Sequence, residues 1–497
     1  MRRLVKNIIF GMLLSITAYF PLMKAQLCCE NATDTCSHSF FRPQSLSQNS
    51  MLELALHNYD YYHKGYDQNG TAYRNILDLQ ITAPFYFIST NRKSTAEYFL
   101  PNCNDQISIA QNNTADISSP WLCLINQTTG QEFQSTVELR PRRQVIGGAF
   151  KLWVDFGACD NCAWYSNFWA SMFVPVVNVR HDLHLKETVI TPGNAPGCPT
   201  NAAQAFNNAT WNYGKLATEQ KTKTGVDDIE FKVGYDFVRN YNNHASGYFA
   251  IFAPTGRKSQ ADYLFEPTFG SGGHTGLGAG FNGEYLFYAC DAHKLSLQTD
   301  FRYAYFLKGK ETRSFDLRNG EWSRYLLVVE LPNVNQPLLP GTNYLTLPVD
   351  VTPGSTVYWW NSLHWNYCCC WDFEAGYSFW WREREKICVD QFDQNVGVFD
   401  IATACPNKTT ANRAVINVSV LGTLHDQTAT ALTAGEINSA SGQHPTASSS
   451  TVYLAGSRII NWCDYEGLLG LGVSYEIAHR KSALSQFGVW LKSSISF

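Results

Sequence analysis

Cysteines are the most reactive side chains in this sequence of 497 residues, which contains 15 of them. Two have the spacing Cys159-Asp160-Asn161-Cys162, which zinc sites and redox-active disulfides both use. No second cysteine pair and no histidine cluster accompanies this spacing, so we interpret it as a loop disulfide or as two separately paired cysteines. Because the total is odd, at least one thiol is free or bonded to another molecule. The disulfide candidates are Cys28, Cys29, Cys36, Cys103, Cys123, Cys159, Cys162, Cys198, Cys290, Cys368, Cys369, Cys370, Cys388, Cys405 and Cys463.

Two histidines form the next group with the right residue types for chemistry. His181 and His184 flank Asp182, a combination that metal sites and acid–base catalysts both use. On a strand, an odd and an even position point to opposite faces, so the two rings cannot share an ion there. No Ser, His and acidic residue stand at a recognised catalytic spacing. We therefore predict no enzyme activity, no cofactor and no bound metal.

Charged residues on the polar faces of alternating segments are the largest polar group in the sequence. If these faces line a lumen, rings or ladders of charge would set its ion preference. The same side chains could instead pair across strands and hold a wall together, and one residue can serve both roles. With 38 basic and 42 acidic residues, weak ion selectivity is expected. The predicted pore-lining residues are Arg180, Asp182, Lys186, Glu230, Lys232, Asp236, Asp300, Arg302, Asp372 and Glu374.

The elements that carry these charges show apolar and polar residues in alternation, which is typical of strands with two unlike faces. The clearest alternating segments are 229–237, 277–287, 295–308, 371–382, 465–477 and 487–497. Turns rich in Gly, Pro and Asn separate them. Helical periodicity is scarce. One short helix is expected at 50–62, and much of 390–450 is expected to be a long loop region.

Composition excludes several classes of protein. Charged residues make up 16% of the chain, against about 25% in ordinary soluble proteins, while aromatic residues reach 14%. The mean hydropathy is nevertheless only −0.22. After the N-terminus, no run reaches the roughly 18 apolar residues of a membrane-spanning helix, which argues against a helical membrane protein. The absence of Lys/Arg clusters argues against a nucleic-acid binder.

Alternating strands suit either a soluble β-sandwich, with the apolar face as its core, or a membrane barrel, with the apolar face on lipid. Here the polar faces contain Gly and opposite charges rather than dense Lys and Glu, and aromatic residues stand at strand ends. The last alternating segment ends in Phe497, which is typical of a barrel-insertion signal. We therefore predict an all-β protein, a transmembrane antiparallel β-barrel of about 16 strands, within a range of 14–18.

The N-terminus predicts export. Basic residues in 1–6, an apolar run over 8–20 and a small residue at Ala25 form the pattern of a signal peptide, here 1–25. We expect 26–72 to be an N-terminal periplasmic or plug-like segment and 73–497 to be the barrel. The expected location is a bacterial outer membrane.

Four segments together resemble a known family. They are 227–256, 264–281, 311–329 and 468–497. They resemble the porin-like outer-membrane proteins of environmental, amoeba-dwelling chlamydiae and, more distantly, the chlamydial major outer membrane protein. The resemblance implies a general diffusion pore for ions and small solutes. It also implies a structural part in a disulfide-linked cell envelope.

The sequence therefore predicts a passive porin that contacts outer-membrane lipid and conducts small hydrophilic solutes or ions. The alternative is a structural or adhesive envelope protein with a plugged barrel and no transport role. We expect Cys368 and Cys370 on the lumen face of a strand and Cys369 on its outer face, with partners elsewhere. Some cysteines are expected to cross-link copies of the chain or other envelope proteins.

Overall fold

The computed structural model describes sixteen parts of the chain. They are 44–49, 78–92, 95–96, 105–110, 115–128, 130–156, 167–240, 243–290, 292–318, 320–332, 338–368, 370–389, 392–399, 429–462, 465–479 and 482–496. The expected signal peptide at 1–25, the expected helix at 50–62 and Phe497 lie outside these parts. No helix in the described parts is long and apolar enough to cross a membrane.

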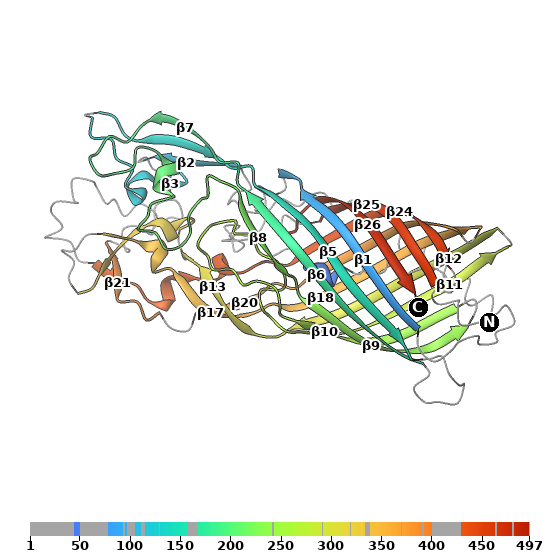
Figure 1. Cartoon of the computed structure of the whole chain (residues 1–497). Coiled ribbons are helices and arrows are strands. Elements are labelled where there is room, and N and C mark those ends of the chain that lie inside the picture. Colours follow the sequence, from blue (N-terminus) through green and yellow to red (C-terminus); the bar gives the residue numbers. More distant parts are fainter. Residues whose placement is uncertain are drawn as a thin grey trace.

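Twelve long antiparallel strands form a closed barrel (Figure 1). The barrel closes because β26 pairs with β1, and β6 pairs with both β5 and β9. Closure leaves no unpaired strand edge, which a wall in contact with hydrocarbon requires. The barrel strands are β1 (Asp78–Thr90), β5 (Arg142–Asp155), β6 (Phe168–Asp182), β9 (Ile229–Asn240), β10 (Asn243–Ala253), β11 (Gly276–Ala289), β12 (His293–Phe306), β18 (Gly354–Tyr367), β19 (Trp371–Arg382), β24 (Ala447–Trp462), β25 (Tyr465–Ala478) and β26 (Gln486–Ser496).

A thirteenth strand, β8 (Lys221–Val226), extends the wall beside β6. Val226 pairs with Val176, and Glu230 at the start of β9 pairs with Phe173. Residues 227–230 therefore lie opposite residues 173–175, four against three, which is the geometry of a β-bulge. The bulge lies at Asp227 and Asp228, between β8 and β9.

The class of fold is as predicted, but the strand number is not: the closed barrel has 12 strands instead of about 16. The residues that were expected to form further barrel strands lie instead in long connections at one end of the barrel. These connections carry small sheets of their own (Figure 1). We call the described residues of these connections the loop cap; the connections are 91–141, 183–220, 254–275, 307–353, 383–446 and 479–485. The opposite end, with connections as short as 241–242, is called the short-turn end.

Four small sheets and a shared apolar core hold the loop cap together. Buried aromatic residues at its centre include Trp121, Phe133, Phe206 and Tyr325. The predicted loop region 390–450 contributes short strands to these sheets. The cap strands are β2 (Gln106–Ala110), β3 (Ile117–Ser118), β4 (Gln134–Glu138), β7 (Lys186–Thr191), β13 (Gly309–Ser314), β14 (Asp316–Leu317), β15 (Leu327–Glu330), β16 (Leu339–Pro340), β17 (Thr346–Thr352), β20 (Lys386–Cys388), β21 (Val396–Phe399), β22 (Ala429–Ala431) and β23 (Ile437–Asn438).

The helical elements that lie wholly within the described residues are single turns. Most lie in the loop cap, and η1 lies inside the barrel. They are η1 (Leu46–Gln48), η4 (Ser119–Leu122), α4 (Ala202–Ala205), η5 (Ser323–Tyr325), η6 (Gly341–Asn343), η9 (Ala434–Glu436) and η10 (Ser439–Gly442).

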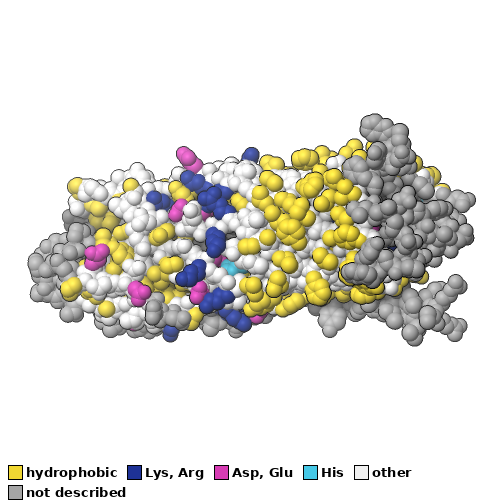
Figure 2. Space-filling view, turned by 60° about the horizontal axis from the view of Figure 1, so that its bottom comes forward, with side chains coloured by type: hydrophobic (Ala, Val, Ile, Leu, Met, Phe, Trp, Pro, Cys, Tyr) yellow, Lys and Arg dark blue, Asp and Glu magenta, His cyan; other side chains and the backbone are white. Residues whose placement is uncertain are grey.

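The outer face of the barrel wall is apolar, as the alternation predicts. Phe85, Phe249 and Leu454 are each more than 60% exposed on this face. On the face seen in Figure 2, hydrophobic side chains gather in a belt across the barrel, with basic side chains along the side of this belt toward the loop cap. Residues of alternate parity point inward and are buried. A closed barrel that is apolar outside and polar inside is a transmembrane β-barrel.

The final predicted strand closes the barrel. In β26, Phe487, Leu491 and Ile495 point outward, while Trp490 and Lys492 point inward and are buried. The strand pairs with β25 on one side and with β1 on the other. Over 487–495, the alternation therefore predicted both faces correctly.

Candidate functional site

The lumen wall carries seven of the ten predicted pore-lining residues. Each is at most 4% exposed and lies on the inward face of its strand. The seven are Glu230, Lys232, Asp236, Asp300, Arg302, Asp372 and Glu374. Their orientation follows the predicted parity, but burial this complete means that they contact other side chains rather than a wide water-filled passage.

The other three predicted pore-lining residues do not face the lumen. On β6, His181 is 2% exposed and points inward, so Arg180 and Asp182 on either side of it point outward. Lys186 belongs to β7 in the loop cap. The prediction failed because β6 is apolar on both faces from Phe173 to Val177, and alternation cannot orient such a segment.

One charged cluster spans β9, β10 and β12. Arg302 donates a hydrogen bond to Glu230, and Lys232 lies 3.4 Å from Glu230. The Tyr248 hydroxyl donates a hydrogen bond of 2.7 Å to Asp300. Opposite charges buried together compensate for lost hydration, so this cluster holds the wall as ion pairs.

A second group of buried charges lies nearer the short-turn end. Lys492 pairs with Glu374 across the interior, and both side chains are inaccessible to solvent. His364 on β18 lies 3.5 Å from Asp372 on β19. His364 was missed at the sequence level because it stands alone in its segment, and only strand register brings it beside two carboxylates.

A short N-terminal segment, residues 44–49, lies inside the barrel, where Figure 1 shows η1. We call this segment the plug. Ser45 Oγ and the Leu46 amide donate hydrogen bonds of 2.8 and 2.9 Å to the two carboxylate oxygens of Asp227. The Leu46 side chain packs in a buried cluster with Val177 and Tyr358.

Further hydrogen bonds tie the rest of the plug to the loop cap and to the wall. Gln48 Nε2 donates a hydrogen bond of 3.0 Å to Ser271, and its carbonyl accepts one from Arg302. Tyr358 donates one of 3.1 Å to the Asn49 side chain. The plug therefore crosses the lumen from the β8–β9 bulge to β18.

Aromatic rings fill much of the remaining lumen. Trp153 and Trp169 stack with ring centroids 4.1 Å apart, and Tyr248 lies beside them. Tyr453 lies between Trp360 and Trp490 in a second group. Beside the plug, a cavity of about 20 Å³ lined by residues that include Asn49 and Glu476 has room for about one water molecule. In the described parts, the inward-facing side chains pack against one another and the plug, whereas a wide aqueous channel was expected for 16 to 18 strands.

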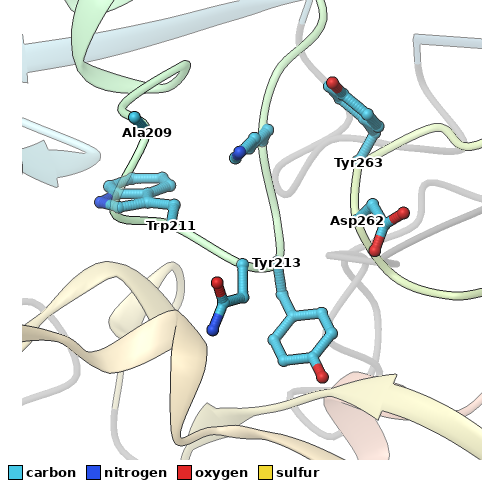
Figure 3. A pocket seen from close by; sticks show the side chains of 7 residues that line it. Ala209, Trp211, Tyr213, Asp262 and Tyr263 are labelled. Atoms are coloured by element: carbon cyan, nitrogen blue, oxygen red, sulfur yellow. The ribbon is translucent and has the colours of Figure 1, made fainter.

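The loop cap contains a separate polar pocket of about 440 Å³. Figure 3 shows Trp211 and Tyr213 from one loop and Asp262 and Tyr263 from a neighbouring loop around it. The loops are joined by hydrogen bonds from Gly214 to Ala261 and from Lys215 to Asp262. Burial, followed by the charge of Glu266, raises the pKa of the Asp262 carboxyl. The Trp211 ring stacks on Tyr325, so one face of it belongs to the core of the cap.

The described cysteines occupy both ends of the molecule. Cys290, Cys368 and Cys370 are exposed in two turns of the short-turn end. The prediction that Cys368 and Cys370 line the lumen was wrong, because β18 ends at Tyr367 and both residues belong to the turn. The loop cap contains the other described cysteines, Cys123, Cys198 and Cys388. The remaining nine candidates, including Cys159 and Cys162, lie outside the described residues.

Comparisons with known proteins find structural likeness only. No family model matches the chain, and no curated protein matches it. An outer membrane channel from Pseudomonas putida F1 has a TM-score of 0.37 at 9% identity, covering 87% of this chain and 99% of that one. A FadL homologue from Pseudomonas aeruginosa has a TM-score of 0.29 at 8% identity, covering 85% and 90%. At these scores, the likenesses carry no argument about what this chain binds or conducts.

Proposed function

We propose that this chain is an outer-membrane channel for ions and small hydrophilic solutes, closed in the described state by its plug. The observation that carries this proposal is the attachment of residues 44–49 to charged and polar groups of the lumen wall and the loop cap, chiefly Asp227, Arg302 and Ser271. When the plug leaves, these groups would face the vacated space. Such a lining suits hydrated ions and polar solutes.

The contacts of the plug are of a kind that can exchange with water. The two neutral hydrogen bonds, to Ser271 and from Tyr358, contribute about 0.5–1.5 kcal/mol net each, and those to Asp227 and Arg302 about 1.5–3 kcal/mol each, because water replaces them when they break. Leu46 is the single large apolar anchor among the described plug residues, and burying a leucine contributes about 1.5–3 kcal/mol. A segment held in this way can act as a gate, whereas the strands of the wall cannot.

The direction of insertion follows from the two ends. In outer-membrane barrels, short turns face the periplasm and long loops face the exterior. The loop cap would then be extracellular, and the turns carrying Cys290, Cys368 and Cys370 would be periplasmic. We also propose that the chain is exported through the signal peptide 1–25. We propose further that it is related to the chlamydial porin-like proteins.

Planar-bilayer recordings test the channel. The full chain is compared with a plug variant, Ser45→Ala/Leu46→Ala/Gln48→Ala, and with Asn178→Ala on the outer face of β6 as a matched control. We expect rare openings for the unmodified chain and the Asn178 control, and a higher open probability for the plug variant. Heat-modifiable migration in SDS gels verifies that each barrel is folded. If folded plug variants stay silent in several lipid mixtures, the channel proposal is wrong.

The packed lumen favours a second candidate, a structural envelope barrel without transport. Stacked aromatic rings and buried ion pairs fill the described interior, as expected of a barrel that is never open. The exposed cysteines at the short-turn end would then join copies of this chain or other envelope proteins. Non-reducing electrophoresis of intact envelopes tests this role: ladders that collapse on reduction support cross-linking, and monomer under every growth condition argues against it.

A further inference from the structure

A histidine and two carboxylates converge on the lumen wall near the short-turn end. His364 on β18 lies directly opposite Glu374 on β19, and Asp372 is two residues before Glu374 on the same inward face. One ligand atom from each of the three side chains lies within 4.8 Å of the other two. All three side chains are at most 3% exposed.

These groups lack the hydrogen bonds that buried polar atoms normally make. Neither ring nitrogen of His364 has a hydrogen-bond partner, and neither carboxylate oxygen of Asp372 has one. Glu374 uses one oxygen for Lys492, and its other oxygen has no partner. Most buried polar atoms in native proteins are hydrogen-bonded, and leaving one without a partner is unfavourable.

The local charge favours a cation. The charges with the largest effect on the His364 ring are those of Asp372, Glu374 and Glu284, and all three are acidic. Lys492 compensates Glu374. An ion pair between protonated His364 and Asp372 does not satisfy the site, because the atoms are 3.5 Å apart and His364 Nε2, Asp372 Oδ1 and the second oxygen of Glu374 still lack a partner.

We propose that His364, Asp372 and Glu374 bind a divalent transition-metal ion of the zinc type. Imidazole nitrogen and carboxylate oxygen are both common zinc ligands, at about 2.0–2.2 Å from the ion. Calcium and magnesium prefer sites made of oxygen alone. Small rotations of the three side chains would bring their ligand atoms to these distances. The bound ion would link β18 to β19 beside the turn at 368–370, whether or not the barrel conducts.

Zinc titration by calorimetry tests the site on the full chain folded in detergent. The cysteines are alkylated first, and bound metal is removed with a chelator, so that thiols cannot supply the ligands. We expect one zinc ion per chain. His364→Gln and Asp372→Asn should each weaken binding by at least about tenfold, since even groups behind a metal ligand contribute about that much.

His181→Gln is the matched control, because His181 is also a buried, inward-facing histidine of the wall but stacks on Phe265 away from the site. It should bind zinc like the unmodified chain. Each variant must show heat-modifiable migration, which establishes that the barrel is closed. No zinc binding by the folded, unmodified chain would overturn the proposal, as would a folded His364→Gln variant that binds zinc undiminished.

Discussion

The backbone amide of Leu46 donates a hydrogen bond of 2.9 Å to Oδ2 of Asp227, 181 residues later in the chain. Asp227 lies in the β-bulge between β8 and β9, where the extra residue re-aims side chains into the lumen. The next residue, Asp228, accepts hydrogen bonds from the Ser271 and Gly256 amides of the loop cap. One irregularity in the wall therefore anchors both the plug and a cap loop.

Replacing Asp227 with asparagine should loosen the plug. The variant loses the negative charge and one of the two acceptor oxygens that hold Ser45 and Leu46. Hydrogen bonds to charged groups contribute about 1.5–3 kcal/mol, so the ratio of open to closed channels should rise by about tenfold or more. Planar-bilayer recordings measure this ratio. Asp182→Asn, on the outer face of the same wall, should leave it unchanged, and an unchanged ratio for Asp227→Asn would mean that the plug is not the gate.

Gly234→Ala should destabilise the barrel, because the Trp169 ring covers this glycine. A Cβ atom at position 234 would lie 2.1 Å from the ring, inside any real contact distance. Overpacking of this kind costs about 1–3 kcal/mol. The temperature at which the heat-modifiable band disappears should fall for Gly234→Ala. The same temperature should be unchanged for Gly456→Ala, because the atom nearest to the added Cβ would be 3.5 Å away.

The stability of the loop cap should depend on its buried ion pair between Arg324 and Asp316. Arg324 donates two side-chain hydrogen bonds of 2.9 and 2.7 Å to Asp316, and both residues are almost fully buried. Asp316→Ala leaves the guanidinium unpaired, which typically costs about 3–5 kcal/mol. Limited proteolysis should then cut the cap faster while sparing the strands. Asp350→Asn, which breaks an exposed pair with Lys308, should leave the cleavage rate unchanged.

Alternation predicted the orientation of most of the wall, since segments such as 229–237 and 371–382 are apolar on one face only. It could not orient β6, because the inward-facing Val177, which packs against the plug, and the outward-facing Val176 are equally apolar. The strand number was overestimated because equal spacing was assumed, whereas long connections fold into the loop cap. The contacts of the plug join segments far apart in the sequence, and the His364 group depends on the register of β18 against β19, so no local pattern marks either.

The reactivity of Cys123 should depend steeply on pH. Burial, reinforced by the nearby Cys198 thiol, raises the pKa of Cys123 to about 11. Only the thiolate is alkylated, so in reduced protein the rate should rise about tenfold per pH unit from pH 7 to 10. A peptide thiol, with a pKa of about 8.5, should level off earlier. Iodoacetamide labelling followed by mass spectrometry measures both rates. In urea, the labelling rate of Cys123 should depend on pH as that of the peptide thiol does. If the folded protein shows this same pH dependence, the Cys123 thiol is not buried.

A charge placed on the apolar belt should oppose membrane insertion. Phe249, near the middle of β10, is 76% exposed on the outer face. Arginine at the bilayer midplane costs about 2–4 kcal/mol, so Phe249→Arg should lower the urea midpoint for unfolding in lipid vesicles and reduce the refolding yield. Asn212→Arg, at an exposed position in the loop cap, should change neither quantity. Two results would show that the outer face does not contact lipid: Phe249→Arg folds as well as the unmodified chain, or it remains monomeric in buffer without detergent. Either result would also overturn the channel proposal.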